Sequence, residues 1–538
     1  MTTTDRPYKR ATTLLLAMCC ALFAMTLAYL ATRGPVKVDS GIFASSGWHL
    51  LNGKALYREV WDSKPPGIFF LNALALAVGG REIESVRTME MLFGGAAALL
   101  VFRIVLVALA SRAVAVVTAL LFAVQFYSGK VFEGGNLTEE YATVFALAGV
   151  LGAVESVHRE GKGKLIACAF AAFPFGLAAL TKEPFALSAL PWFAYSLLAR
   201  PADGEPRRTT ARATIWVAAG LLPIVLVLGL LASQGAAAYW WDSITYHLPT
   251  TAWVADASSG EVYGEPSSSL FERLTSNAWP AWNNVLFRIP LTTVAAVCGL
   301  IALTSRDFLR RTRYFPLVVV LMFALDYVGT LISPRQYGHY YMQLVGSFVL
   351  FAACGGAAVL ERLNGLRSRL PSVSTKLRLI AGLLLVAIAA FGIVREDIVG
   401  RLQSKLSHAR RKSHSAIAYS VAELARPGDQ LWATAGNNSR YYLETGLLSP
   451  TRFLFVYDHV FVDTWLDSGT DKLAQLRSDL DERTPRFVVV SDGATLFLEQ
   501  TDLLDWIRSN YELAEASDPD ENARGYRSLL FVRRDADQ

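Results

Sequence analysis

Charged residues are scarce in this sequence. Of its 538 residues, 18% are charged and 53% are hydrophobic, and 51 Lys and Arg against 46 Asp and Glu leave a formal net charge of +5. Soluble domains carry about 25% charged residues, so an ordinary soluble protein is not expected. The same composition argues against a disordered, fibrous or nucleic-acid-binding protein.

The shortage of charge is confined to the first 400 residues. Residues 401–538 contain 17 basic and 21 acidic side chains, which is 38 of the 97 charges, and have a net charge of −4. The first 400 residues hold the other 59 charges, with a net charge of +9. We therefore predict a membrane-embedded domain over residues 1–400 and a soluble domain over residues 401–538.

Cysteine is scarce as well. The five cysteines all lie within apolar runs, and residues 401–538 have none; they are Cys19, Cys20, Cys168, Cys298 and Cys354. Neither a disulfide framework nor a Cys-x-x-Cys metal site can be built from them. We expect them to be small buried apolar residues.

Long apolar runs, by contrast, fill the first 400 residues. The first, Ala11–Ala31, is longer than the roughly 7–15 residues of a signal-peptide core, so we expect it to be retained as a helix. Ten further runs approach the about 17–25 residues that span a bilayer. They lie near 86–110, 113–128, 140–157, 164–180, 184–199, 213–233, 284–304, 314–332, 340–360 and 378–394. An α-helical polytopic membrane protein with about eleven spans is predicted.

The segment Pro66–Gly80 is apolar but has only 15 residues and begins with proline, so we predict a half-helix at the membrane surface. The short loops on the N-terminal side then carry 21 Lys and Arg, whereas loops 129–139, 181–183 and 333–339 carry one each. Because cytoplasmic loops are rich in Lys and Arg, the N-terminus is expected in the cytoplasm.

The opposite, outer side then receives loops 33–85 and 234–283 and the C-terminal domain. Loop 234–283 contains Trp and Tyr clusters typical of the headgroup level, and we expect juxtamembrane helices in both loops. These assignments place the protein in the plasma (inner) membrane as a multi-pass protein with an extracytoplasmic C-terminal domain.

Residues 411–538 alternate helix-like stretches with short apolar runs, which is typical of a small α/β domain. The helix-like stretches are Ser415–Ala425, Asp471–Asp481 and Leu498–Ser509, and the apolar runs are Gln430–Ala433, Phe453–Val456, Phe487–Val490 and Leu529–Val532. We expect this domain to lie over the outer loops.

The first outer loop contains an unusual set of polar residues. Asp39 follows the first span directly, and a later segment contains Tyr57, Asp62 and Lys64 before two prolines. We take Asp39 as a candidate catalytic residue, Lys64 as a candidate phosphate ligand, and Tyr57 and Asp62 as candidate acceptor or sugar contacts. A plain solvated linker is the alternative interpretation.

The loop before residue 141 offers two further acids, Glu139 and Glu140, with Asn136 just before them. Thr138 can cap the helix that begins there, and acids in its first turn suit the helix dipole. Capping therefore explains one of the two glutamates. We select Glu139 as a second catalytic candidate and keep Asn136 and Glu140 as sugar or acceptor candidates; a glycosylation acceptor at Asn136 is disfavoured so close to the membrane.

Basic residues on the outer side complete the set. Arg binds phosphate in a bidentate fashion and Lys acts as a point charge, so Lys64, Lys182 and Arg335 can surround one phosphate. His339 and Tyr340 join this candidate phosphate site, and Tyr337 joins the acceptor candidates. Snorkelling of long side chains to the interface is the alternative explanation.

This arrangement suits the transfer of a sugar from a polyprenyl phosphate. Asp39 would act as general base on an acceptor hydroxyl, which attacks the anomeric carbon and inverts it. Lys64 and Arg335 would stabilise the departing phosphate.

The motifs resemble the GT-C superfamily of polyprenyl-phosphate-sugar glycosyltransferases, in particular glycosyltransferase family 39, related to protein O-mannosyltransferases and the lipid A aminoarabinose transferase. The resemblance covers about residues 10–360. It is carried by Asp39, the segment Tyr57–Pro66 with its Trp-Asp-x-Lys-Pro-Pro ending, Asn136-Leu137-Thr138-Glu139, Thr181-Lys182 and Arg335–Gln343.

The resemblance implies that Asp39 is the catalytic aspartate, Glu139 the acid of the second loop, and Lys64 the lysine at the lipid phosphate. It also implies a bacterial envelope enzyme with a glycan, lipid or protein hydroxyl as acceptor. Ser40 follows Asp39 where the family commonly has a second acid. Some relatives hold a divalent cation, for which Glu139, Asp62 and His339 are the residues here that can supply ligands.

Two other function classes compete with the enzyme. A transporter or flippase of lipid-linked sugars predicts paired broken helices and ionisable residues near the midplane. Asp326 is the one acid well inside a late span, and a hydrogen bond to Tyr327 or to a neighbouring helix explains it equally well. A non-catalytic membrane scaffold is the third class. Membrane lipids are expected partners of all three, and nucleic acid of none.

Overall fold

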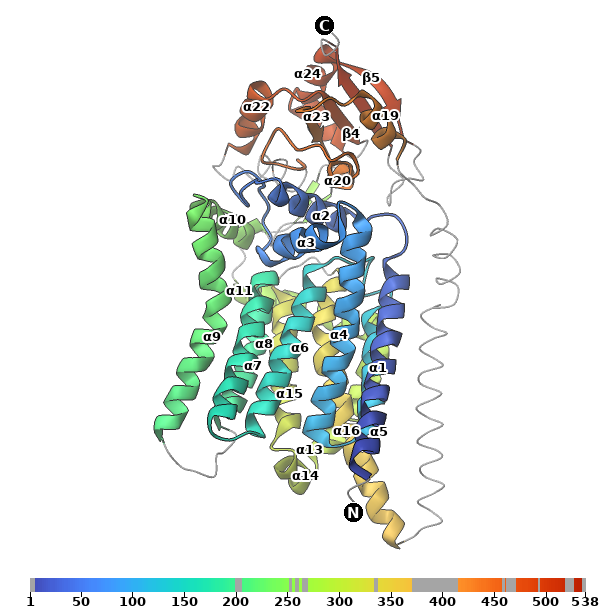
Figure 1. Cartoon of the computed structure of the whole chain (residues 1–538), viewed down its shortest axis with the longest axis vertical. Coiled ribbons are helices and arrows are strands. Elements are labelled where there is room, and N and C mark those ends of the chain that lie inside the picture. Colours follow the sequence, from blue (N-terminus) through green and yellow to red (C-terminus); the bar gives the residue numbers. More distant parts are fainter. Residues whose placement is uncertain are drawn as a thin grey trace.

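A bundle of nearly parallel helices is covered at one end by a layer of helices, strands and loops (Figure 1). The structure is a computed structural model. It describes residues 5–198, 206–250, 254–256, 261–263, 270–332, 337–369, 415–456, 460, 471–491, 494–517 and 527–534. We call the covered end, which carries residues 38–79, the upper end, and the end at which the N-terminus lies the lower end.

The bundle is built from apolar helices. They are α1 (Asp5–Thr32), α4 (Ile83–Leu109), α5 (Arg112–Phe126), α6 (Thr138–Val157), α7 (Gly161–Thr181), α8 (Phe185–Leu198), α9 (Pro206–Ser233), α15 (Phe315–Leu331) and α16 (Met342–Arg369). Six described helices are long and apolar enough to cross a membrane, or seven if one bent pair is a single span. A multi-pass membrane protein is thereby confirmed. The predicted span 378–394 lies outside the described residues.

The bent pair corrects one predicted span. We expected one helix over 284–304, but α11 (Leu270–Arg288) is followed by α12 (Pro290–Val297) and α13 (Leu300–Leu303) after a bend of 97°. Pro290 has no N–H and disfavours helical geometry at Ile289 before it. The buried Gln125 side chain donates to the Arg288 carbonyl oxygen at 3.1 Å and satisfies the end of α11. A short α14 (Arg306–Arg311) follows at the lower end.

Three helices lie across the upper end instead of along the bundle: α2 (Val38–Leu51), α3 (Gly67–Gly79) and α10 (Ala237–Thr250) (Figure 1). The half-helix predicted over Pro66–Gly80 is therefore correct. A two-stranded antiparallel pair, β1 (Val254–Asp256) and β2 (Glu261–Tyr263), follows α10. Both large loops thus contain helices, and their placement at the membrane surface stays a prediction.

The C-terminal region is a small α/β domain, as predicted. Its elements are α19 (Ala416–Leu424), β3 (Leu431–Ala433), η2 (Gly436–Asn438), α20 (Arg440–Thr445), α22 (Lys472–Glu482), β4 (Phe487–Ser491), α23 (Thr495–Gln500), α24 (Leu503–Asn510), β5 (Tyr511–Ala516) and β6 (Ser528–Arg533). The sheet has the order β3-β4-β6-β5. β3 and β4 are parallel, and β6 is antiparallel to both of its neighbours.

Three details of this domain differ from the prediction. Phe453–Val456 is buried but not a strand, because its backbone bonds elsewhere; the Phe453 N–H donates to the Thr451 hydroxyl at 2.8 Å. The helix expected over 498–509 is split into α23 and α24 at Asp502, whose φ is 56°. The edge strand β5 was not expected, because its exposed side chains include acids and hide the apolar pattern.

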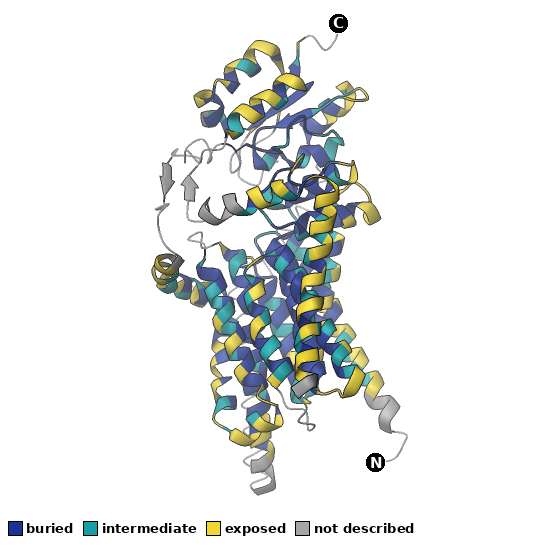
Figure 2. Cartoon of the chain, turned by 90° about the vertical axis from the view of Figure 1, so that its left-hand side faces the viewer, coloured by how far each residue is buried: buried dark blue, intermediate teal, exposed yellow. Residues whose placement is uncertain are grey.

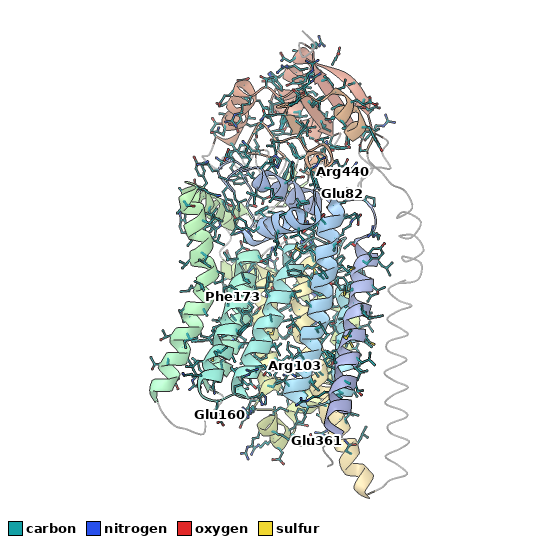
Figure 3. All side chains as sticks on the ribbon, in the orientation of Figure 1. Glu82, Arg103, Glu160, Phe173, Glu361 and Arg440 are labelled. Carbon is teal, nitrogen blue, oxygen red and sulfur yellow. The ribbon has the colours of Figure 1, made fainter. Side chains whose placement is uncertain are left out.

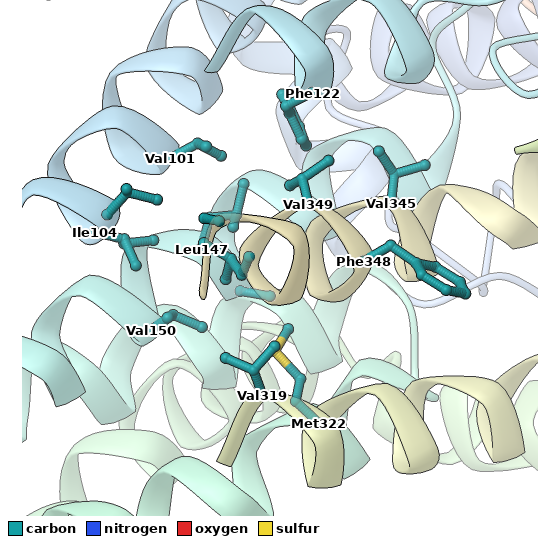
Figure 4. Packing of buried hydrophobic residues seen from close by; sticks show 14 of the residues in the cluster. Val101, Ile104, Phe122, Leu147, Val150, Val319, Met322, Val345, Phe348 and Val349 are labelled. Atoms are coloured by element: carbon teal, nitrogen blue, oxygen red, sulfur yellow. The ribbon is translucent and has the colours of Figure 1, made fainter. Parts of the chain in front are cut away.

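Among the apolar clusters of the described residues, two connect these parts. One fills the helix bundle, where Val101, Leu147, Met322 and Phe348 from four helices meet (Figure 4). The other runs without interruption from α2 and α3 into the C-terminal sheet. Because apolar burial is the main source of stability, the upper loops and the C-terminal domain stabilise each other.

Polar contacts fix this docking. The Ser449 N–H donates to Nε2 of the buried His49 at 2.9 Å, and Ser45 Oγ donates to the Ser439 carbonyl oxygen at 2.5 Å. Arg452 Nη2 donates to the Tyr57 carbonyl oxygen at 2.8 Å. The C-terminal domain therefore holds both α2 and the loop that follows it.

The distribution of exposed apolar residues and of basic residues fits a protein that crosses a membrane. Exposed positions recur along the outward faces of the bundle helices, many of them large apolar residues such as Leu222 and Leu226 on α9 (Figure 2). The turns that carry most of the basic residues lie at the lower end, near Glu160 and Glu361 in Figure 3. The candidate site residues lie on segments at the upper end.

Candidate active site

The turn before α6 has an unusual backbone. All four residues from Glu133 to Asn136 have positive φ, at 47°, 108°, 90° and 54°. Two glycines adopt such angles at no steric cost, and Asn tolerates them better than most residues. Strain of this kind is retained where the surroundings over-determine it, and it often marks a functional site.

Glu139, in the first turn of α6, forms a buried ion pair with Lys182. Their Oε1 and Nζ atoms are 2.9 Å apart, with side-chain exposures of 3% and 13%. Glu139 Oε2 accepts a hydrogen bond from Thr138 Oγ1 at 2.8 Å, so Thr138 does not cap α6 as we had expected. Burial works against the charge of Lys182, but Glu139 outweighs it and raises the lysine pKa.

The late loop, residues 337–341 directly before α16, packs against this pair. The Lys182 ammonium lies 5.0 Å from the centre of the Tyr340 ring, a favourable cation–π distance. The imidazole of His339 packs edge-on against the same ring at 4.7 Å. Tyr337, 46% exposed, stacks on His339 at 5.5 Å. The predicted residues Lys182, His339 and Tyr340 are thus brought together.

His339 has a partner that the sequence did not suggest. Its Nδ1 lies 2.6 Å from Glu133 Oε2, and the Gly338 N–H donates to Glu133 Oε1 at 2.8 Å. Arg288 lies 3.7 Å from the same carboxylate. Burial alone would raise the pKa of Glu133, but the bond to His339 and these neighbours hold the pKa below its ordinary value.

Lys64 sits on a braced turn at the start of α3. The Lys64 N–H donates to Asp62 Oδ1 at 2.9 Å, and its carbonyl oxygen accepts from the hydroxyl of Tyr57 at 2.8 Å. A Cβ on Gly67 would lie 2.6 Å from Thr181 Oγ1, so this turn packs directly on the end of α7. Lys64 and Lys182 therefore occupy the same corner of the upper end.

The side chains of the candidates Tyr57 and Asp62 form hydrogen bonds within that turn. Both are buried, and their polar atoms bond the backbone of Lys64. Burial, followed by the charges of Asp62 and Glu183, raises the pKa of Tyr57 and keeps its proton in place. Their observed role is to shape the loop that presents Lys64.

Two candidates remain without an observed partner. Asp39 is half-buried in the first turn of α2, and Lys64 is half-buried in the turn that precedes α3. Within the described residues, neither side chain makes an ion pair or a side-chain hydrogen bond. Arg335 lies outside the described residues.

Asn136 and Glu140 point into the protein instead of toward this corner. The Asn136 amide exchanges hydrogen bonds of 2.9 and 3.0 Å with the Asn72 amide on α3 and donates to the Ser40 carbonyl oxygen at 3.3 Å. Its backbone N–H donates to Glu140 Oε2 at 3.2 Å and to Glu90 on α4. Asn136 is fully buried, which removes it as a glycosylation acceptor.

Two comparisons with known proteins bear on the fold and the family. Residues 63–232 match the family model of dolichyl-phosphate-mannose-protein mannosyltransferases. ArnT from Cupriavidus metallidurans, solved bound to undecaprenyl phosphate, aligns over 100% of this chain and 99% of its own with a TM-score of 0.55 and 14% identity. This chain has the ArnT fold. The apo form of ArnT aligns over 97% of this chain and 98% of its own, with a TM-score of 0.55 and 16% identity.

These findings confirm the family resemblance inferred from the motifs. The matched range 63–232 includes Lys64, Glu139 and Lys182 and excludes Asp39 and the C-terminal domain. The likeness to ArnT includes that domain. No curated protein matches in a sequence comparison.

The three candidate metal ligands do not form a divalent-cation site among the residues that the structure describes. Among the described residues, no three His, Cys, Asp or Glu form a group that could hold a metal ion. The three ligand candidates each have another partner: the Lys182 ammonium for Glu139, a backbone N–H for Asp62, and Glu133 for His339 Nδ1.

Sequence reasoning missed several residues of this region. Glu90, Asn72, Glu133 and Arg288 all take part in the polar contacts described above. An acid in an apolar run signals a functional or paired group, so Glu90 could have been found. Asp326, which was noted, is bonded by Ser188 at 2.5 Å and Gln343 at 3.1 Å from neighbouring helices.

Proposed function

We propose that this chain is a membrane glycosyltransferase that moves a sugar from a polyprenyl-phosphate donor to a hydroxyl acceptor at its upper end. The family model and the ArnT-like fold support the class of enzyme. The acceptor would be a glycan, lipid or protein hydroxyl of the cell envelope.

One observation carries the proposal. Among the described residues, Asp39 on α2 and Lys64 before α3 have no ion pair, and Asn136 and Asn72 link the two segments that carry them. A general base needs a free lone pair, and a leaving phosphate needs a free cation. Lys182 and His339, two further candidate phosphate contacts, are each paired with an acid.

The reaction follows from these roles. Asp39 takes the proton of the acceptor hydroxyl as its oxygen attacks the anomeric carbon. The bond between that carbon and the phosphate oxygen breaks, and polyprenyl phosphate leaves with the added negative charge. Lys64 stabilises this charge, with Arg335 as the second contact expected from the sequence. Direct displacement inverts the sugar.

Glu139 acts in this proposal by holding Lys182. The ion pair and the Tyr340 ring fix the ammonium at one place, from which it adds a short-range contact to the phosphate. His339 is held by Glu133 in the same way. Tyr337, the exposed aromatic of this loop, is our candidate for a stacking contact with sugar or acceptor.

The upper end is proposed to face away from the cytoplasm, with residues 1–400 in the membrane and 401–538 as an extracytoplasmic domain. Basic residues at the lower end support this orientation. A reporter fused after residue 538 should be active on the outer side alone, and a cytoplasmic signal would invert the assignment.

The test of the activity is Asp39→Asn in the full-length protein, assayed for sugar transfer from a polyprenyl-phosphate sugar. Loss of the base should lower the rate by about 10²–10⁴-fold. Thermal unfolding should not change, since the Asp39 carboxylate has no observed partner. Glu82→Gln, an exposed upper-end acid, is the matched control (Figure 3).

Full transfer by Asp39→Asn would refute the mechanism. A wild-type protein that moves the intact donor across vesicles without cleaving it would instead be a flippase. If neither activity appears with any donor, a scaffold role is left.

A further inference from the structure

A second cationic site lies at the lower end, away from the proposed active site. A crevice of about 410 Å³ opens between α1, α4 and α5. Three arginines border it, Arg10, Arg103 and Arg112, one from each helix. Figure 3 places Arg103 low on the bundle, near the lower half of α1.

The rest of the wall is almost entirely apolar. The other lining residues are Thr13, Leu14, Ala17, Leu99, Phe102 and Leu106. Leu14 and Leu99 are 63% and 41% exposed on helices that cross the membrane, so this wall faces lipid chains. An apolar groove in that position suits an acyl chain.

The arginines lie where the apolar spans begin and end. Arg10 is the first residue of the span Arg10–Thr32, and Arg112 is the first residue of α5. Arg103 precedes the end of α4 by six residues, about 9 Å along the axis. Their guanidinium groups therefore lie near the membrane interface, which is the level of the lipid phosphates.

Positive charge exceeds negative charge here. Arg103 is paired with Glu155 at 2.6 Å, and Arg159 shares that carboxylate at 3.3 Å. In the part of the chain that the structure describes, Arg10 and Arg112 have no ion pair.

We propose that this crevice binds one anionic phospholipid of the lower-end leaflet. The phosphate lies between Arg10 and Arg112, because guanidinium groups bind phosphate in a bidentate fashion. One acyl chain runs along Leu14, Phe102 and Leu106. Basic pockets between membrane helices select anionic headgroups in this way, whereas the apolar wall alone would accept any lipid. The proposal stands apart from the glycosyltransferase assignment, since no residue of that site takes part.

The experiment is native mass spectrometry of the detergent-purified full chain, titrated with phosphatidylglycerol or phosphatidylcholine. One phosphatidylglycerol should bind in preference to phosphatidylcholine. Each arginine near the headgroup adds about fivefold in affinity, so Arg10→Gln/Arg112→Gln should weaken binding roughly thirtyfold. The control Arg306→Gln/Arg310→Gln removes two exposed lower-end charges outside the crevice and should bind normally.

A second variant tests the role of the apolar wall of the crevice. Ala17→Phe fills the groove while keeping every charge and should also lose the lipid. Equal binding of the two phospholipids, full binding by Arg10→Gln/Arg112→Gln, or equal loss in the control would overturn the proposal. Inorganic phosphate that displaces the bound lipid completely would also overturn it, because the acyl chain would then contribute nothing.

Discussion

Glu139 and Glu140 are consecutive residues in the first turn of α6, and both are buried, yet their surroundings are opposite. Glu139 faces the Lys182 ammonium at 2.9 Å, under the late loop. Glu140 faces another acid, Glu90, and the backbone N–H of Asn136. A helix turns by about 100° per residue, so adjacent positions reach different neighbours.

The surroundings of Glu139 and Glu140 stabilise a buried carboxyl group in different ways. A buried charge needs an opposite charge, which Lys182 supplies to Glu139. Glu140 instead lies beside Glu90, since both accept from the Asn136 N–H, and two adjacent buried acids favour one shared proton over two charges. The comparison predicts that the Glu139 side serves the reaction and that the Glu140 side serves the fold.

The largest effect is expected where the ion pair is broken. Lys182→Met leaves Glu139 buried without a counter-charge, which should lower the free energy of unfolding by about 3–5 kcal/mol. Sugar transfer should fall with it. Thermal unfolding of the purified protein and the transfer assay measure the two effects separately.

The double variant Glu139→Gln/Lys182→Met sharpens this prediction. Removing both charges should restore most of the stability lost in Lys182→Met, while transfer stays low because the ammonium is gone. Recovery of both properties would mean that the pair is structural, and the contrast between the two glutamates would disappear.

A pH effect of intermediate size is expected at His49, where the C-terminal domain docks on α2. Burial, opposed by the Nδ1–H bond to the Ser45 carbonyl oxygen, lowers the pKa of His49 to about 4 from 6.5. Between pH 6.5 and pH 4, His49 therefore binds a proton in the unfolded chain but not in the folded chain. Stability is full above pH 6.5 and falls as the pH drops toward 4, by about 2 kcal/mol at pH 5.

Unfolding midpoints at pH 7.5 and pH 5 for wild type and His49→Gln test this expectation. The wild-type difference should shrink in the variant, since glutamine does not titrate. The depressed pKa of Glu133 adds its own loss at lower pH, so the measurement stops at pH 5. An unchanged pH difference in His49→Gln would assign the effect to other groups.

The sequence allowed the large features to be predicted. Apolar runs predicted the helix bundle, Pro66–Gly80 the surface helix α3, and the alternating tail the α/β domain. The motifs around Lys64, Glu139 and Lys182 also led to one corner of the upper end. These features depend on local composition and spacing, which a single sequence contains.

What could not be predicted depends on distant pairing. Glu133 and His339 are 206 residues apart in the sequence, and Gln125 and Arg288 are 163 residues apart. No local sequence pattern predicts either contact. The contacts of Tyr57 and Asp62 with the Lys64 backbone were not predicted, for a related reason. A polar residue in a loop gives the same signal whether it contacts a substrate or, as here, the backbone of Lys64.

The smallest effect is expected at Glu140, and it decides the comparison. Glu140→Gln keeps an oxygen to accept from the Asn136 N–H and supplies an amide N–H in place of the shared proton, so the free energy of unfolding should change by less than about 1 kcal/mol. Transfer should stay near the wild-type level. Glu140→Ala, by contrast, leaves Glu90 without its carboxyl partner and weakens the hold on Asn136, at a cost of about 1–3 kcal/mol. If Glu140→Gln instead abolished transfer while unfolding normally, the inner carboxyl pair would belong to the reaction, and the functional division between neighbours on α6 would be wrong.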